Sequence, residues 1–185
     1  MMVLTPSTMI PLGSVLPDFA LPDGTGAVFD VKDFQGADAT LVAFWCNHCP
    51  FVKHLLEGFV KYANYYASQG VTVVAINSND ASTHPADSPE QMVREAKEWS
   101  FPFPYLVDET QDVAKGFQAA CTPDFFLFDG DRRLAYRGQF DRSRPSNDVP
   151  VSGEDLRRAT ERVLAGEQPA EAQAPSIGCN IKWKR

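Results

Sequence analysis

The sequence TLVAFWCNHCP, residues 40–50, joins two patterns that together indicate one class of fold. Residues 40–45 are a short, almost continuous apolar run, which is typical of a strand buried on both faces. From Pro50 to Ala67, apolar residues recur at helical spacing, so we expect a helix there, with the proline at its first position. The thiols of Cys46 and Cys49 therefore lie where a buried strand passes into a helix.

Strand and helix patterns alternate along the rest of the chain. They predict an α/β fold with a central mixed sheet, helices on its flanks, an antiparallel hairpin at one edge and short strands near the N-terminus. The predicted strands are two short ones within residues 17–34 and further ones at 71–76, 104–107, 125–128 and 134–136. The predicted helical segments are one turn capped by Asp30, a helix at 89–99 capped by Ser88, one at 110–117 and one at 152–164 capped by Ser152.

Length and charge limit the organisation and the partners. The chain has 185 residues, enough for one domain with a full core. We assign residues 1–165 to that domain and 166–185 to an extended C-terminal tail, which begins with a stretch rich in Ala, Gln, Glu and Pro. The formal net charge of −7 argues against nucleic-acid binding. The end of the tail is basic, and it either docks on the acidic domain or lies in solvent.

No targeting or membrane signal is evident. Residues 1–17 contain no Lys or Arg and no continuous apolar run, and no stretch reaches the roughly 18 apolar residues of a membrane span. We therefore expect a cytoplasmic protein without a membrane partner. In that reducing compartment, four cysteines are more often catalytic, metal-binding or core residues than structural disulfides.

The position of the Cys-X-X-Cys pair indicates redox chemistry. A thiol at a helix N-terminus faces unpaired backbone N–H groups and the positive end of the helix dipole, and both stabilise the thiolate. With Pro50 at the first helical position, Cys49 becomes the N-cap residue and Cys46 lies in the preceding loop. We expect Cys49 to be the more acidic thiol. His48 either assists a thiolate or is an exposed loop residue.

The residues around this pair resemble the thioredoxin superfamily, and more closely its peroxiredoxin-like alkyl hydroperoxide reductase/thiol-specific antioxidant group. The resemblance spans residues 13–183. It rests on the segments Gly13–Leu21, Asp33–Gly36, Phe44–Pro50, Thr122–Asp129 and Ser176–Lys184. It implies a thioredoxin fold in which Thr122 and Pro123 form a cis-proline loop beside the thiols, with Trp45 and His48 as further substrate-binding residues.

The same resemblance implies catalytic roles. Aligned with either family pattern, the attacking cysteine is Cys49, and Cys46 replaces the threonine that peroxiredoxins carry. The buried acid of thioredoxins is Ala43 here. Peroxiredoxins also need an arginine, and none of Arg132, Arg133 and Arg137 can be assigned to that role. Cys121, beside the cis-proline loop, and Cys179, carried back by the tail, are possible additional redox thiols.

We therefore predict a thiol–disulfide oxidoreductase in which Cys49 attacks and Cys46 resolves. It needs no bound cofactor, acts on a disulfide-containing protein or small molecule, and is reduced by a dithiol partner. A thiol peroxidase with antioxidant activity is the first alternative. A metal-binding or metal-delivery module, with Cys46, His48, Cys49 and a distant cysteine around Zn or Cu(I), is the second.

Overall fold

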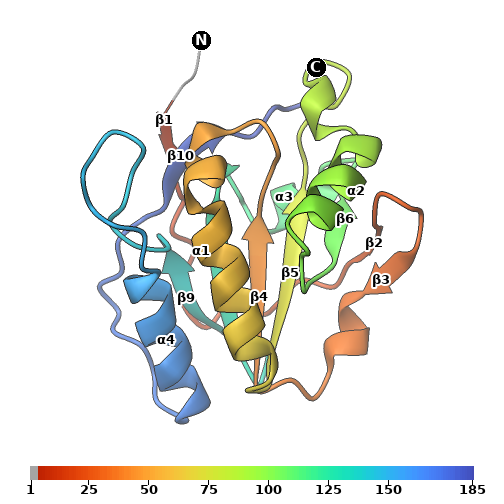
Figure 1. Ribbon diagram of the computed structural model, residues 1–185. Helices are drawn as coiled ribbons and strands as arrows, with labels where there is room; N and C mark the ends of the chain where they lie inside the picture. The colour runs from red at the N-terminus through yellow and green to blue at the C-terminus, as the bar shows by residue number, and fades with distance from the viewer. Residues whose placement is uncertain (1–3) are drawn as a thin grey trace.

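A five-stranded mixed sheet forms the centre of the molecule. The computed structural model describes residues 4–185 (Figure 1), so the first three residues of the predicted domain lie outside the described residues. The strand order is β6-β5-β4-β8-β9, with β4 parallel to β5, β5 parallel to β6, and β8 antiparallel to both β4 and β9. The bounds are β4 Ala39–Phe44, β5 Val71–Asn77, β6 Tyr105–Val107, β8 Asp124–Asp129 and β9 Leu134–Gly138. The predicted mixed sheet with an antiparallel edge hairpin is confirmed.

Alternation along the central strands builds a core on each face of the sheet. Leu41 and Ala43 of β4 face one cluster, which includes residues of helices α1 (Pro50–Ala67), α2 (Pro89–Glu98) and α4 (Glu154–Leu164). Val42 and Phe44 face the other, which contains Ala114 of α3 (Asp112–Gly116) and residues of the N-terminal segment. Figure 1 shows α1 and α4 in front of the sheet and α3 behind it. Every residue of β4 is buried, as its apolar run predicts.

Most helices begin where their local signals place them. Helix α1 runs from Pro50 to Ala67, as predicted, and Cys49 is its N-cap. Ser88 accepts a hydrogen bond from the Gln91 amide and caps α2. The predicted cap position of α4 is wrong by one residue: Gly153, at φ 68°, is the N-cap residue. Ser152 lies one position earlier, where its hydroxyl still accepts the amide of Glu154, the first helical residue, at 3.2 Å.

The reason for the later start of α4 is tertiary. The carboxylate of Asp141 accepts the amides of Ser152 and Gly153 at 2.7 Å each, which holds both residues before the helix begins. A Cβ on Gly153 would lie 2.5 Å from the ring of Phe140, so only glycine fits this left-handed position.

The N-terminal segment forms a hairpin of β2 (Ala20–Pro22) and β3 (Val28–Asp30), followed by the 3-10 turn η1 (Val31–Phe34), with Asp30 as the cap. The hairpin and the turn are confirmed. A second turn, η2 (Pro85–Asp87), lies in the predicted polar loop before α2. Among residues 4–185, no helix has the length and apolar character needed to cross a membrane.

A second sheet, which the sequence patterns do not predict, joins the two ends of the chain. Its strands are β1 (Leu4–Pro6), β10 (Ile177–Asn180) and β7 (Cys121–Thr122), in the order β1-β10-β7 and antiparallel throughout. The tail is therefore extended, as predicted, and it is also docked.

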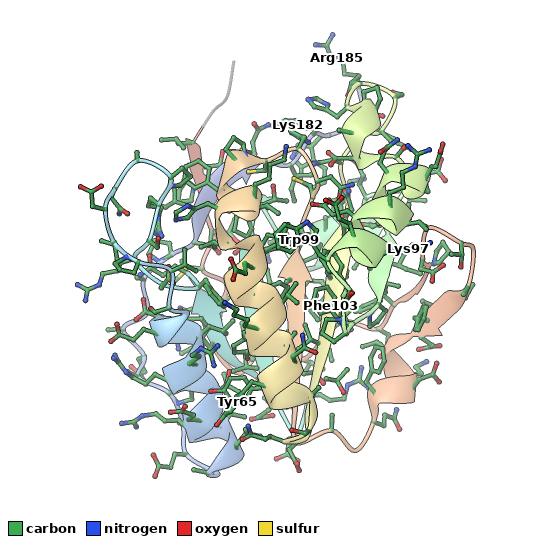
Figure 2. All side chains as sticks on the ribbon, viewed as in Figure 1. Tyr65, Lys97, Trp99, Phe103, Lys182 and Arg185 are labelled. Atoms are coloured by element: carbon green, nitrogen blue, oxygen red, sulfur yellow. The ribbon has the colours of Figure 1, made fainter. Side chains whose placement is uncertain are left out.

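Contacts continue beyond β10 to the end of the tail. The Asp80 amide donates to the Lys182 carbonyl at 2.8 Å, and the Lys182 amide donates to Asn79 Oδ1 at 2.8 Å. Figure 2 places Lys182 and Arg185 at the end of the molecule where α2 begins. Of the two alternatives for the basic end, docking on the domain is the one that the structure supports.

Candidate active site

Cys46 and Cys49 lie at the carboxyl end of β4, at the junction with α1. Both side chains are fully buried. Cys46 is in the loop after the strand, and Cys49 immediately precedes the helical Pro50. The predicted placement of the two thiols is confirmed, and both belong to the core cluster beneath α1.

The loop at Thr122 and Pro123 touches both thiols. The peptide bond between these residues is cis. The Thr122 carbonyl oxygen lies 3.2 Å from Cys49 Sγ, and Thr122 Oγ1 lies 3.2 Å from Cys46 Sγ. The predicted cis-proline loop beside the thiols is therefore present, and Thr122 is its contacting residue.

Strand β10 brings a third thiol to the same point. Cys179 pairs with Thr122 across the β10–β7 ladder, and it lies close enough to Cys49 for each thiol to shift the pKa of the other. Gly178 permits this approach, because a Cβ there would lie 2.0 Å from the Thr122 carbonyl oxygen. The expected position of Cys179, carried back by the tail to the thiol pair, is therefore confirmed.

The hydrogen bonds around Cys49 separate the pKa values of the three thiols. The side chains of Cys179 and then Cys46 donate to Cys49, as do the amides of Val52 and Cys179, and they hold the pKa of Cys49 well below its usual range. The Thr122 carbonyl oxygen can only accept a hydrogen bond, so it favours the protonated form of Cys49. The several donors to Cys49 outweigh the effect of this one acceptor. Burial, and then the hydrogen bond to Cys49, raises the pKa of Cys46. The hydrogen bond to Cys49, and then burial, raises the pKa of Cys179.

The fourth thiol is in a different environment. Cys121 is fully buried, and burial, followed by the charge of Asp124, raises its pKa far above the usual range. Both carboxylate oxygens of Asp124 are buried and meet no hydrogen-bond partner among residues 4–185, and burial raises the pKa of this acid to about 7. Cys121 is thus a protonated, enclosed thiol.

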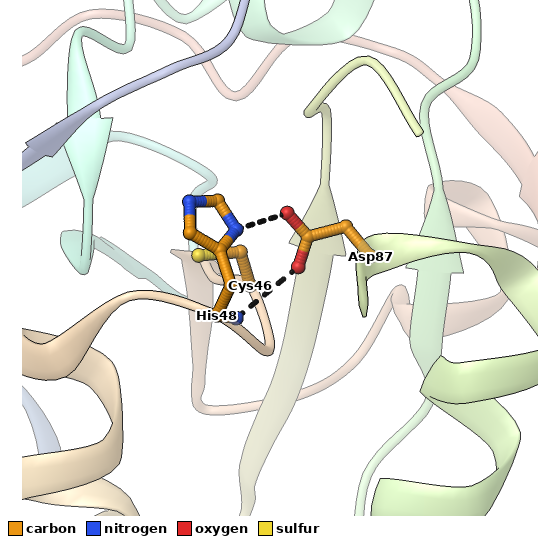
Figure 3. A group of neighbouring side chains, drawn as sticks. All are labelled: Cys46, His48 and Asp87. Atoms are coloured by element: carbon orange, nitrogen blue, oxygen red, sulfur yellow. Dashed lines mark hydrogen bonds and ion pairs between the residues drawn. The ribbon is translucent and has the colours of Figure 1, made fainter. Parts of the chain in front are cut away.

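His48 and Asp87 form a pair beside Cys46 (Figure 3). His48 Nδ1 lies 2.5 Å from Asp87 Oδ2, and the side chain of His48 is 24% exposed. Asp87 Oδ1 also accepts the backbone amides of Asn47 at 2.8 Å and His48 at 3.3 Å. Asp87 therefore holds both the backbone of the Cys46–Cys49 loop and the ring of His48. Of the two alternatives for His48, a merely exposed loop residue does not fit, because its side chain is only partly exposed and is paired with a buried carboxylate.

No local sequence pattern singles out Asp87. It comes from η2, 39 residues beyond His48, in a segment that reads only as a polar loop. Burial raises its pKa, but hydrogen bonds from His48, Asn79 and Asn47 outweigh that effect and lower it, so Asp87 is a buried carboxylate anion. The available signal was its position after β5, at the sheet edge where ligands of open α/β folds gather.

One ligand atom each from Cys46, His48 and Asp87 lies within 4.8 Å of the others, which is a possible metal-binding arrangement. However, Asp87 already accepts from four N–H donors, those of the Asn47 and His48 backbones, His48 Nδ1 and Asn79 Nδ2. A metal would have to displace one of them. The donor set fits a buried anion better than a metal ligand.

One predicted substrate-binding residue, Trp45, packs in the core, and the three arginines that could not be assigned bond to other parts of the chain. Trp45 is fully buried and stacks on Phe59 at a ring-centroid distance of 4.8 Å, so it is a core residue and not a wall of a substrate site. The three candidate arginines make their hydrogen bonds away from the thiols: Arg132 to Asp18, Arg133 to the Gly13 carbonyl, and Arg137 to Ile10 and Gln173.

Comparisons with known proteins agree with this fold. Two solved structures superimpose almost fully: a hypothetical protein from Sinorhizobium meliloti 1021 (51% identity, TM-score 0.96, 97% of this chain and 98% of that one) and an uncharacterized conserved protein from Geobacillus kaustophilus (52%, 0.97, 100% and 98%). The thiol-disulfide oxidoreductase ResA of Geobacillus kaustophilus is 28% identical over 131 residues, which is 68% of this chain and 67% of that protein. The model of the AhpC/TSA family matches residues 12–137. With its thioredoxin fold and its thiol pair at the strand–helix junction, the chain belongs to the AhpC/TSA family.

Proposed function

We propose that this chain is a thiol–disulfide oxidoreductase in which Cys49 attacks a substrate disulfide and Cys46 resolves the mixed disulfide. The observation that carries the proposal is the asymmetry between the two thiols, since hydrogen bonds favour the thiolate at Cys49 while burial keeps Cys46 protonated. The thiolate is the form that attacks a disulfide sulfur. The Cys46–Cys49 dithiol supplies two electrons, the substrate leaves as two thiols, and a disulfide remains in the chain.

The reaction implies partners that are part of the proposal. The substrate is a disulfide-containing protein or small molecule, and a reducing dithiol returns the chain to its starting state. No bound cofactor takes part, because both half-reactions are thiol exchange. We propose that the exchange takes place in the cytoplasm, in keeping with four unpaired cysteines.

Access to Cys49 depends on the tail. An extended substrate would pair with the edge of β7, beside the cis-proline loop. That edge is already occupied by β10, since Thr122 pairs with Cys179 and Cys121 pairs with Asn180. We propose that a protein substrate displaces β10 and takes its place along β7. Cys179 occupies the position that a cysteine of such a substrate strand would take beside Cys49. It is therefore a candidate redox thiol. Cys121 is the weaker one, because its surroundings keep it protonated.

Disulfide and peroxide turnover, compared in one preparation, test the proposed function. We expect faster reduction of a protein disulfide, because none of the three candidate arginines faces the thiols to polarise a peroxide. The rate constant with hydrogen peroxide should stay close to that of a free thiolate at the same pH. A peroxide rate constant far above that value, with slow disulfide turnover, would instead support the thiol peroxidase alternative.

A second measurement separates two roles of Cys179. The Cys179→Ala variant removes an S–H donor to Cys49, so we expect the pKa of Cys49 to rise by about one unit. Cys179→Ser retains an O–H donor and should keep that pKa near its wild-type value. Peptide-resolved alkylation against pH measures both. If the two variants lose turnover equally while the pKa of Cys49 is unchanged, Cys179 acts as a redox thiol and not as a donor.

A further inference from the structure

We propose that His48, with its ring oriented by Asp87, accepts the proton of Cys46 when Cys46 resolves the mixed disulfide on Cys49. The inference rests on the proposed disulfide exchange and assigns it a proton acceptor. His48 would be the residue that moves the proton, and Asp87 a positioning residue that acts through His48.

The Asp87 contact decides which nitrogen of His48 can accept a proton. A buried carboxylate anion can only accept hydrogen bonds, so the hydrogen between Asp87 Oδ2 and His48 Nδ1 belongs to the imidazole. In a neutral ring that leaves a free lone pair on Nε2. The Asp87 carboxylate therefore holds His48 in the tautomer that has a basic Nε2.

The location of Cys46 shows why an acceptor is needed. Its side chain is fully buried, and besides Cys49 its polar neighbour is the Thr122 hydroxyl, at 3.2 Å, which is not a base at neutral pH. A His48 ring nitrogen and an Asp87 oxygen are within 4.8 Å of it (Figure 3). Such contacts often shorten only when the reacting complex forms. Since the side chain of His48 is partly exposed, it can pass the proton on to solvent.

The charges around the ring favour the transfer. After burial and the Cys49 hydrogen bond, the negative charge of Asp87 raises the pKa of Cys46. A proton on His48 places a cation next to that anion and offsets its effect on the new thiolate. The other titratable groups nearby are His84, whose ring stacks on His48 at 4.9 Å, and Lys182 and Asp80, which act on His84. Tyr105 and Glu95 also lie close enough to interact with the charge of Asp87.

The step balances without a further reactant. Cys46 loses its proton to His48 Nε2, and its thiolate attacks the sulfur of Cys49. The Cys46–Cys49 bond forms, and the bond from Cys49 to the substrate sulfur breaks. The substrate leaves as a thiolate with the electron pair and takes a proton from His48 or from water, so the substrate is reduced and the dithiol is oxidised.

Single-turnover kinetics with equimolar dithiobis(nitrobenzoate) test the proposal, because attack and resolution each release one coloured thiolate. In His48→Gln we expect the first release to stay within about twofold of wild type and the second to slow by about 10²-fold. His54→Gln is the matched control, since that histidine lies on α1 and bonds to Ser143. Its two releases should match those of wild type.

Asp87→Asn tests the positioning role. The asparagine keeps an oxygen for the loop amides, but its NH₂ group can only donate to the ring, which moves the ring hydrogen to Nε2 and removes the base. We expect the same slow second release, and a double variant no slower than His48→Gln alone. In both variants the second release should rise about tenfold per pH unit, because Cys46 must then ionise to water, whereas in wild type it should rise less steeply.

The outcomes are distinct. If His48→Gln slows both releases alike, or neither, or leaves the pH profile of the second unchanged, the proton-acceptor role is wrong. If the wild-type chain releases no coloured thiolate at all, the proposed exchange itself is wrong, and this inference falls with it.

Discussion

A Cys49→Ser variant is expected to lose disulfide reduction by about 10³-fold or more, while Cys46→Ser stops at the mixed disulfide. The reason is the division of roles between the two sulfurs. Hydrogen bonds from Cys179 and Cys46 favour the thiolate at Cys49, which is why we propose it as the attacking group. Without Cys46, the sulfur that displaces the substrate is missing, so the adduct on Cys49 persists.

This prediction is tested by mixing each variant with a disulfide-linked target protein that has one cysteine per chain. Mass spectrometry then identifies the products. The Cys46→Ser variant should accumulate a covalent adduct that maps to Cys49, and the wild-type chain should end with a Cys46–Cys49 disulfide. An adduct on Cys46 in the Cys49→Ser variant would reverse the roles. Rapid release of the adduct in Cys46→Ser, with a Cys49–Cys179 bond left behind, would assign resolution to Cys179.

Gly178→Ala is expected to have the largest effect on stability among single-methyl changes near the site. The added Cβ would lie 2.0 Å from the Thr122 oxygen and 2.6 Å from the Thr122 carbonyl carbon. Both are backbone atoms, so β10 must separate from β7 to relieve the contact. We expect a loss of about 3 kcal/mol, the upper part of the usual range for overpacking, which corresponds to about 6–12 °C in the unfolding midpoint.

Thermal unfolding and native-state alkylation of Cys179 measure this effect together. Gly116→Ala is the matched control, because a Cβ at that position in α3 meets nothing within 4 Å. It should unfold near the wild-type temperature and leave Cys179 protected. A Gly178→Ala protein with wild-type stability and a protected Cys179 would show that the β7–β10 contact yields more easily than its geometry indicates.

The sequence by itself determined the strand–helix core of the fold and the thiol pair. The apolar run before Trp45 and the proline after Cys49 are local signals, and they predicted β4, α1 and the N-cap position of Cys49 as the structure has them. Strands and helices of this kind carry their periodicity within one segment, so a single sequence is enough to locate them.

Only the tertiary structure decided what surrounds the thiols. Strand β10 is four residues long and β7 is two, too short for a periodic signal, and each exists because it pairs with a distant segment. Asp87 reaches His48 from η2, and Asp141 delays the start of α4, by hydrogen bonds between residues that no local pattern connects. The identity and position of the paired thiols are thus local properties, whereas their enclosure and the contacts that shift their pKa values arise between segments far apart in the chain.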